Sequence, residues 1–223
     1  ASTTKVEASH PLGTPARNLR APTSYRPPAS GRRVASLATV SAMANPEYDV
    51  LELEPSKALL TELGALCARA FFDDPFFLAL SDQAMLRQRG LGLFFRSHLK
   101  AAKKHCVFTG VRDEAGTLLG ICVWQRPGTY PLGVLGQVAE SLGALRALFP
   151  RPASIPRGLR YTLAMEKAHV EAEHWYLVLL AADPMVWRRG VGEAMLRPGL
   201  DRADAEGLPC YLETQKSDNL AYY

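Results

Sequence analysis

The loop around Gly190 holds the residues whose types and spacing have the clearest chemical potential. Arg188-Arg189-Gly190-Val191-Gly192 follows an apolar run and precedes a segment with helical periodicity. First-turn N–H groups of a helix have no intrahelical partner, and the helix dipole adds partial positive charge there. Glycine also lets an anion approach the backbone without a Cβ in the way. The loop therefore predicts a phosphate-binding site, although a plain tight turn explains the glycine spacing equally well.

Other kinds of site find little support in the sequence. A dinucleotide fingerprint would need a glycine three positions after Gly192, where Met195 stands, and the Gly-Lys-Ser/Thr of a P-loop does not follow the glycines. The chain contains no Gly-x-Ser-x-Gly motif of a serine hydrolase. Four histidines have no visible catalytic constellation and are interpreted as surface or satisfied core residues: His98, His105, His169 and His174.

The four cysteines are widely spaced, lie in apolar segments and have no Cys-x-x-Cys pattern: Cys67, Cys106, Cys122 and Cys210. This pattern predicts small buried side chains in a reducing compartment, not a zinc site or a disulfide framework. We therefore expect no metal and a cytoplasmic location. A membrane-spanning helix needs about 20 apolar residues, and no run approaches that length.

The positive charge of the chain is concentrated at its beginning. Residues 1–42 carry six Lys or Arg and one Glu, a net charge of +5, whereas the remaining 181 residues carry 20 basic and 21 acidic side chains. Nucleic-acid binding would need a basic surface on the folded body, so we expect no nucleic-acid or membrane partner. The Ser-, Pro- and Arg-rich composition of the leader predicts disorder, either as an upstream tail or as an organelle transit peptide. The predicted organisation is a leader at residues 1–45 and one domain at residues 46–223.

The elements that must position the loop follow from hydrophobic periodicity, which repeats every two residues in strands and every three to four in helices. Residues 174–182 are almost entirely apolar, which predicts a strand buried on both faces. The helix after the loop should end at Gly207 and be kinked by Pro198. The predicted strands are residues 49–54, 106–112, 117–125, 174–182 and 209–214, and the predicted helices are residues 57–72, 81–104 in one or two pieces, 132–149, 157–173 and 190–205.

From residue 175 to its end the chain resembles the GCN5-related N-acetyltransferase (GNAT) superfamily. The matching motifs are Trp175-Tyr176-Leu177 through Asp183-Pro184, Arg189-Gly190-Val191-Gly192, the stretch from Gly207 to Thr214, and Asn219-Leu220-Ala221-Tyr222-Tyr223. Leu196-x-Pro198-Gly199 and residues 212–223 are most similar to the puromycin N-acetyltransferase branch. The resemblance implies an α/β fold in which helices flank a mixed, mostly antiparallel sheet with a splay between its two central strands.

The resemblance also implies which residues bind acetyl-CoA, the co-substrate of the superfamily. Backbone N–H groups of the loop and helix start would hold the pyrophosphate, the preceding strand would bind the pantetheine arm, and Asn219 would contact the cofactor. Tyr223 would be the general acid that protonates the departing thiolate. The implied cofactor-binding residues are Leu180, Ala181, Ala182, Arg188, Arg189, Gly190, Val191, Gly192, Glu193, Ala194 and Asn219.

Some positions near the motif raise questions that the sequence leaves open. Trp187 stands where the family has Gln or Arg, and Glu193 places a carboxylate in the first helical turn. Glu213 is a candidate for the base that removes a proton from the amine, and a purely structural carboxylate is the alternative. Asp183 is interpreted as a loop cap. The chain ends at Tyr223, whereas the family continues with further strands, so we expect the final strands of the sheet to be missing.

The function implied by the resemblance is acetylation of a primary amine of a small molecule, by direct attack on the thioester of acetyl-CoA. The acceptor would bind between helices near residues 70–90 and in the region of residues 127–160. Two alternatives remain: a catalytically weak or inactive acyl-CoA-binding module, and a protein-interaction domain.

Overall fold

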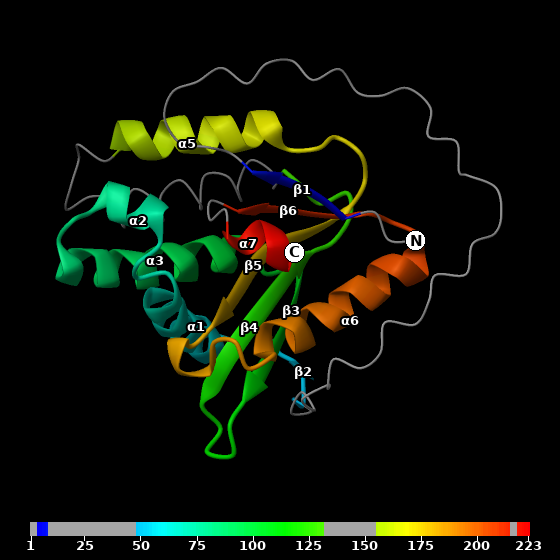
Figure 1. The fold of residues 1–223 in the computed structure, drawn as a ribbon, viewed down its shortest axis with the longest axis horizontal. Helices are drawn as coiled ribbons and strands as arrows, with labels where there is room; N and C mark the ends of the chain where they lie inside the picture. Colours follow the sequence, from blue (N-terminus) through cyan, green and yellow to red (C-terminus); the bar gives the residue numbers. More distant parts are fainter. Residues whose placement is uncertain (1–3, 9–47, 132–154, 215–217) are drawn as a thin grey trace, which may run out of the picture.

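A computed structural model of the chain describes residues 4–8, 48–131, 155–214 and 218–223 (Figure 1). Its centre is a six-stranded sheet with the strand order β1-β6-β5-β4-β3-β2. Three neighbouring pairs, from β2 to β5, are antiparallel, whereas β5–β6 and β1–β6 are parallel. The predicted mixed, mostly antiparallel sheet is therefore confirmed. The strands are β1 (Thr4–Ala8), β2 (Leu51–Glu52), β3 (Cys106–Arg112), β4 (Leu118–Gln125), β5 (Trp175–Ala182) and β6 (Cys210–Thr214).

Most helices lie where the periodicity places them. The predicted helices do not include α2, η2 or α7. In α2, Asp74 Oδ1 accepts a hydrogen bond from the Phe76 N–H at 3.0 Å, and Pro75 begins the helix. The helix predicted for residues 132–149 lies outside the described residues. The helices are α1 (Lys57–Ala70), α2 (Pro75–Leu80), α3 (Ala84–Ala102), α5 (Ile155–Ala168), the 3-10 turn η2 (Pro184–Val186), α6 (Val191–Glu206) and α7 (Asp218–Tyr222). Among the described residues, none of these helices combines the length and apolar character needed to cross a membrane.

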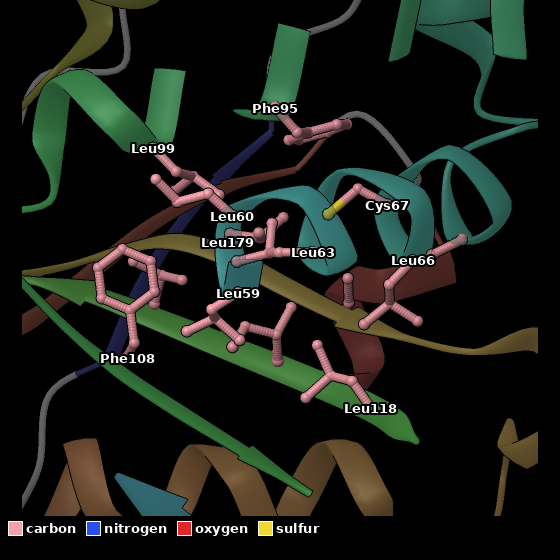
Figure 2. Packing of buried hydrophobic residues seen from close by; sticks show 14 of the residues in the cluster. Leu59, Leu60, Leu63, Leu66, Cys67, Phe95, Leu99, Phe108, Leu118 and Leu179 are labelled. Atoms are coloured by element: carbon pink, nitrogen blue, oxygen red, sulfur yellow. The ribbon is translucent and has the colours of Figure 1, made fainter. Parts of the chain in front are cut away.

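One side of the sheet is covered by α1 and α3. Ser56 caps α1, because its Oγ accepts the Leu59 N–H at 3.1 Å. The leucines of α1 point into a cluster that includes Phe95 and Leu99 of α3 and Phe108 of β3 (Figure 2). Burying these side chains anchors the helical layer to the β3–β4 hairpin, which was the clearest strand pair in the sequence.

The helix α3 is continuous through Gly90 and Gly92, so the second of the two predicted arrangements, a broken helix, does not form. Its glycine at position 92 has a packing role. A Cβ added to Gly64 of α1 would lie 2.7 Å from the Gly92 carbonyl oxygen. The backbones of α1 and α3 therefore approach each other closely at this point.

The other side of the sheet is covered by α6, which buries Val191, Met195 and Ala203 against the strands. Gly199 lies directly on the indole of Trp124, so this position has no room for a side chain. The helix continues through Pro198 and ends as predicted at Gly207, whose φ of 67° is left-handed and whose N–H bonds the Ala203 carbonyl.

Two sequence predictions about the rest of the chain can be compared with the fold. All four cysteines are buried and free, as expected. Within the leader predicted to be disordered, Thr4–Ala8 instead forms strand β1, which pairs in parallel with β6. The other leader residues lie outside the described residues, so the proposed leader and its boundary stay a prediction.

Candidate active site at the fork between β5 and β6

The two parallel strands β5 and β6 pair at their beginnings and then separate. Their register comprises three residue pairs and ends at Leu177 opposite Leu212. The ladder between β4 and β5 skips Val178, because Val123 pairs with Leu179 and the next residue, Trp124, with Leu177. Such a bulge bends a strand locally. The result is the predicted splay, in which the second half of β5 has no hydrogen-bonded partner in β6.

The second half of β5 presents backbone groups to this gap. The Asp183 N–H bonds the Leu119 carbonyl of β4 at 2.8 Å. Residues of an antiparallel strand direct their N–H and C=O groups alternately to either side. Leu180 and Ala182 therefore direct theirs toward the gap, whereas Ala181 directs its groups toward β4. The side chains of β5, predicted to be buried on both faces, instead alternate between buried and half-buried.

The start of α6 borders the gap with unused N–H groups. Gly190 is the N-cap residue with a left-handed φ of 85°, and no side chain caps the helix. Arg188 is also left-handed, with a φ of 60°. The first turn, from Val191 to Glu193, therefore offers its backbone donors and the positive end of the helix dipole. Binding of a phosphate at this turn stays a prediction.

The charged side chains at this turn are arranged in favour of an anion. Arg188 and Arg189 are exposed beside the helix start. Glu193, whose carboxylate could have repelled a phosphate, is 60% exposed and lies 3.5 Å from Arg197 on the next turn. Ala194 already donates its N–H to the Gly190 carbonyl at 3.0 Å. Of the residues predicted to bind the pyrophosphate, residues 191–193 therefore keep their backbone N–H groups as donors.

Three interactions hold the loop between β5 and α6: a capping carboxylate, an ion pair and a hydrogen bond donated by an indole. Asp183 Oδ1 accepts the Met185 N–H at 3.1 Å, which confirms the expected loop cap. Its Oδ2 accepts from the Arg69 Nε at 2.8 Å, so the loop is tied to α1. Trp187, half-exposed, donates its indole N–H to the Ala182 carbonyl at 2.8 Å. This carbonyl is one of the groups that face the gap.

The C-terminal helix α7 lies over the same gap. A Cβ added to Gly192 would lie 2.7 Å from the Tyr222 hydroxyl and 3.8 Å from the Leu180 side chain, so Tyr222 reaches over the start of α6. Tyr223 packs against the cluster under α6, and burial together with Tyr222 and Cys122 raises the pKa of its phenol. Asn219 donates from Nδ2 to the Thr214 hydroxyl of β6 at 3.3 Å.

Glu213 is the first residue of β6 beyond its last pair with β5. It lies on the sheet face opposite α6, because its neighbour Leu212 belongs to the cluster under α6 and strand side chains alternate. The Tyr211 hydroxyl donates to Glu213 Oε1 at 2.7 Å, and His169 Nδ1 lies 3.7 Å from the same oxygen. Glu213 Oε2 is buried and has no hydrogen-bond partner among the described residues.

Comparison with known proteins identifies the fold. The model of the acetyltransferase (GNAT) family matches residues 74–223, which is about two thirds of the chain. The chain belongs to the GNAT acetyltransferase family. Members of this family generally transfer an acetyl group from acetyl-CoA to an amine. The match begins well upstream of the 49 residues that carried the resemblance in the sequence.

Two solved acetyltransferase structures are similar to this chain to different degrees. A histone acetyltransferase HPA2 and related acetyltransferase from Corynebacterium glutamicum is 22% identical, with a TM-score of 0.54 over 79% of this chain and 82% of its own. An aminoglycoside acetyltransferase from an uncultured soil sample is 15% identical, with a TM-score of 0.40 over 78% of this chain and 87% of its own. The first similarity supports the GNAT fold, with the fork between β5 and β6 at its centre.

The sequence missed one residue that the fold brings to the fork. His169 follows α5, and the sequence analysis interpreted it as a surface or satisfied core residue: its ring stacks on Tyr130 at 3.6 Å between centroids, and Nδ1 lies 3.7 Å from Glu213 Oε1. No local motif could have indicated this, because the three residues lie in segments far apart in the chain. Among the described residues, no group of three or more His, Cys, Asp or Glu side chains could hold a metal ion.

Proposed function

We propose that this GNAT protein acetylates a primary amine of a small molecule, using acetyl-CoA and direct attack on its thioester. The observation that carries the proposal is the fork. The β5–β6 pairing ends at Leu177 and Leu212, and the uncapped start of α6 borders the gap that follows. A strand-like arm with an anionic end would find both a free strand edge and an anion site there.

The residues at the fork fit acetyl-CoA. Leu180 and Ala182 would bind the pantetheine arm through the backbone, and the N–H groups of residues 191–193 would hold the pyrophosphate. Gly192 has no room for a side chain, because a Cβ at that position would lie 2.7 Å from the Tyr222 hydroxyl. Arg188, Arg189 and Asn219 are the remaining side chains proposed to contact the cofactor.

The chemistry would be divided between the two faces of the sheet. Bound acetyl-CoA supplies an acetyl group already activated as a thioester. Glu213 would take a proton from the acceptor ammonium, because an amine attacks only in its neutral form. Tyr223 would protonate the departing thiolate, and its raised pKa keeps the phenol protonated near neutral pH.

The proposed acceptor is a small-molecule amine. The similarity to the puromycin N-acetyltransferase branch favours a small-molecule amine, and Pro198-Gly199, one of the motifs behind it, is built into the contact between α6 and Trp124. A cytoplasmic location belongs to the same proposal, because four buried thiols suit a reducing compartment.

A second candidate function is an acyl-CoA-binding module without efficient catalysis. The bond from the Trp187 indole to the Ala182 carbonyl favours it, because that bond occupies a group that the pantetheine arm would use.

Two measurements test these proposals in order. Calorimetric titration with acetyl-CoA should give saturable binding, and an absence of binding at millimolar cofactor would contradict both candidates. Release of free CoA thiol should then depend on an added primary amine from a panel containing puromycin, an aminoglycoside and an arylalkylamine. Binding without amine-dependent release by any of them would favour the binding module.

A further inference from the structure

We propose that His169 is a positioning residue for Glu213. In this proposal His169 and Tyr211 hold one carboxylate oxygen, so that the other oxygen is the one that accepts the proton of the acceptor amine. The inference rests on the proposed acetyltransferase function and adds a residue from outside the regions that the family resemblance covers.

The contacts of the Glu213 carboxylate are asymmetric. Oε1 accepts the Tyr211 hydroxyl at 2.7 Å and lies 3.7 Å from His169 Nδ1. Oε2 is buried without a partner among the described residues. A buried polar atom without a partner is costly, and functional sites are where such atoms persist. The unused oxygen is therefore the one suited to receive a proton.

The surroundings of His169 fix its ring. The ring stacks on Tyr130, with 21° between the planes, and meets Tyr176 and Tyr211 edge-on at 5.0 and 4.8 Å. The side chain is only 7% exposed and that of Glu213 10%. The orientation of the His169 ring is thus set by the packing rather than by solvent.

The described titratable groups that face His169 come from four segments: Tyr130 after β4, His174 before β5, Tyr176 on β5, and Tyr211 and Glu213 on β6. Among them, Glu213 is the one carboxylic acid side chain. Burial lowers the pKa of His174, whose Nδ1 lies 2.6 Å from the Ala172 carbonyl oxygen. The carboxyl group that His169 meets is therefore that of Glu213.

The proton transfer balances within these groups. The N–H bond of the acceptor ammonium breaks and an O–H bond forms at Glu213 Oε2, which frees the nitrogen lone pair for attack on the thioester carbon. Tyr211 and His169 keep Oε1 on their side, which leaves Oε2 to take the proton. Loss of the imidazole should therefore change both the rate of this step and its dependence on pH.

The rate test uses His169→Gln in the full chain, with His98→Gln as the matched control, since His98 lies on α3 stacked against Phe94. With the amine of the panel that gives the fastest CoA release, we expect kcat/KM to fall about 10- to 100-fold, the scale of a misplaced catalytic group. The acidic limb of its pH profile should also move. His98→Gln should stay within about twofold of wild type. An unchanged rate and profile for a folded His169→Gln would overturn the proposal.

A second measurement does not depend on activity. In the free, ¹⁵N-labelled chain, the chemical shift of His169 Nδ1 should differ between wild type and Glu213→Gln, because Nδ1 lies 3.7 Å from Glu213 Oε1. Equal shifts would overturn the pairing even if the enzyme is active. If wild type binds no acetyl-CoA, the proposed function fails, and the ring measurement alone still decides whether His169 and Glu213 are coupled.

Discussion

The fork between β5 and β6 is lined by backbone groups on one side and by side chains on the other. The side that borders α6 consists of backbone groups from one continuous stretch, in which Gly190 is the N-cap of α6 and Gly192 lies beneath the Tyr222 hydroxyl. The opposite side consists of side chains from distant segments, with Glu213 held by Tyr211 and faced by His169. A backbone site is specified by a short motif, whereas a side-chain site is assembled only by the fold.

Glu213→Gln should have the largest effect, and only on the side-chain half of the fork. Removing a general base costs about 10² to 10⁴ in rate, so kcat/KM for CoA release should fall by that factor. Acetyl-CoA affinity from calorimetry should stay unchanged, because the backbone half is intact. Glu114→Gln, at an exposed carboxylate in the turn between β3 and β4, is the control and should retain the wild-type rate. A Glu213→Gln enzyme with normal kcat/KM would remove Glu213 from the chemistry.

Gly192→Asp should affect the backbone half instead. The new carboxylate would face the first-turn N–H groups and compete with the pyrophosphate. Loss of hydrogen bonds to a charged group costs about 1.5 to 3 kcal/mol, which corresponds to roughly a 10- to 100-fold weaker Kd for acetyl-CoA in calorimetry. Gly192→Ala, which adds a Cβ without charge, should weaken binding less. Equal affinity for Gly192→Asp and wild type would show that the phosphate binds elsewhere.

The same contrast explains what could be predicted from the sequence. The helix start at Gly190 and the helix end at Gly207 depend on neighbouring residues, so the local sequence indicated both. The bulge at Val178, the ring stack of Tyr130 on His169 and strand β1 depend on contacts between distant segments. Gly90 and Gly92 suggested a broken helix because the packing of Gly92 against Gly64 of α1 cannot be read locally.

The helical layer on the Glu213 face offers a matched pair of stability variants. Gly64→Ala would place a Cβ 2.7 Å from the Gly92 carbonyl oxygen and force α1 and α3 apart, at about 1 to 3 kcal/mol of unfolding free energy. Gly92→Ala meets its nearest atom at 3.5 Å and should gain about 0.5 to 1 kcal/mol from helix propensity. Urea unfolding of both variants measures the difference. Equal shifts would show that the two helices are not in close contact there.

Trp187→Phe should have the smallest effect, and in the favourable direction. Phenylalanine cannot donate to the Ala182 carbonyl, which then becomes available to the pantetheine arm. One hydrogen bond is worth about 0.5 to 1.5 kcal/mol, so the Kd for acetyl-CoA should improve by roughly 2- to 10-fold in calorimetry. Trp187→Leu, which likewise lacks the donor, should behave in the same way. Weaker binding in both would mean that the indole itself contributes to the cofactor site.

The central claim is that acetyl-CoA binds along the backbone of the fork. Backbone amide shifts in NMR spectra, recorded while acetyl-CoA is added, test it residue by residue. The amides of Leu180, Ala182 and residues 191–193 should move most, whereas Ala181, whose N–H faces β4, should move less. Saturable binding that leaves the amides of residues 191–193 unmoved would contradict the account.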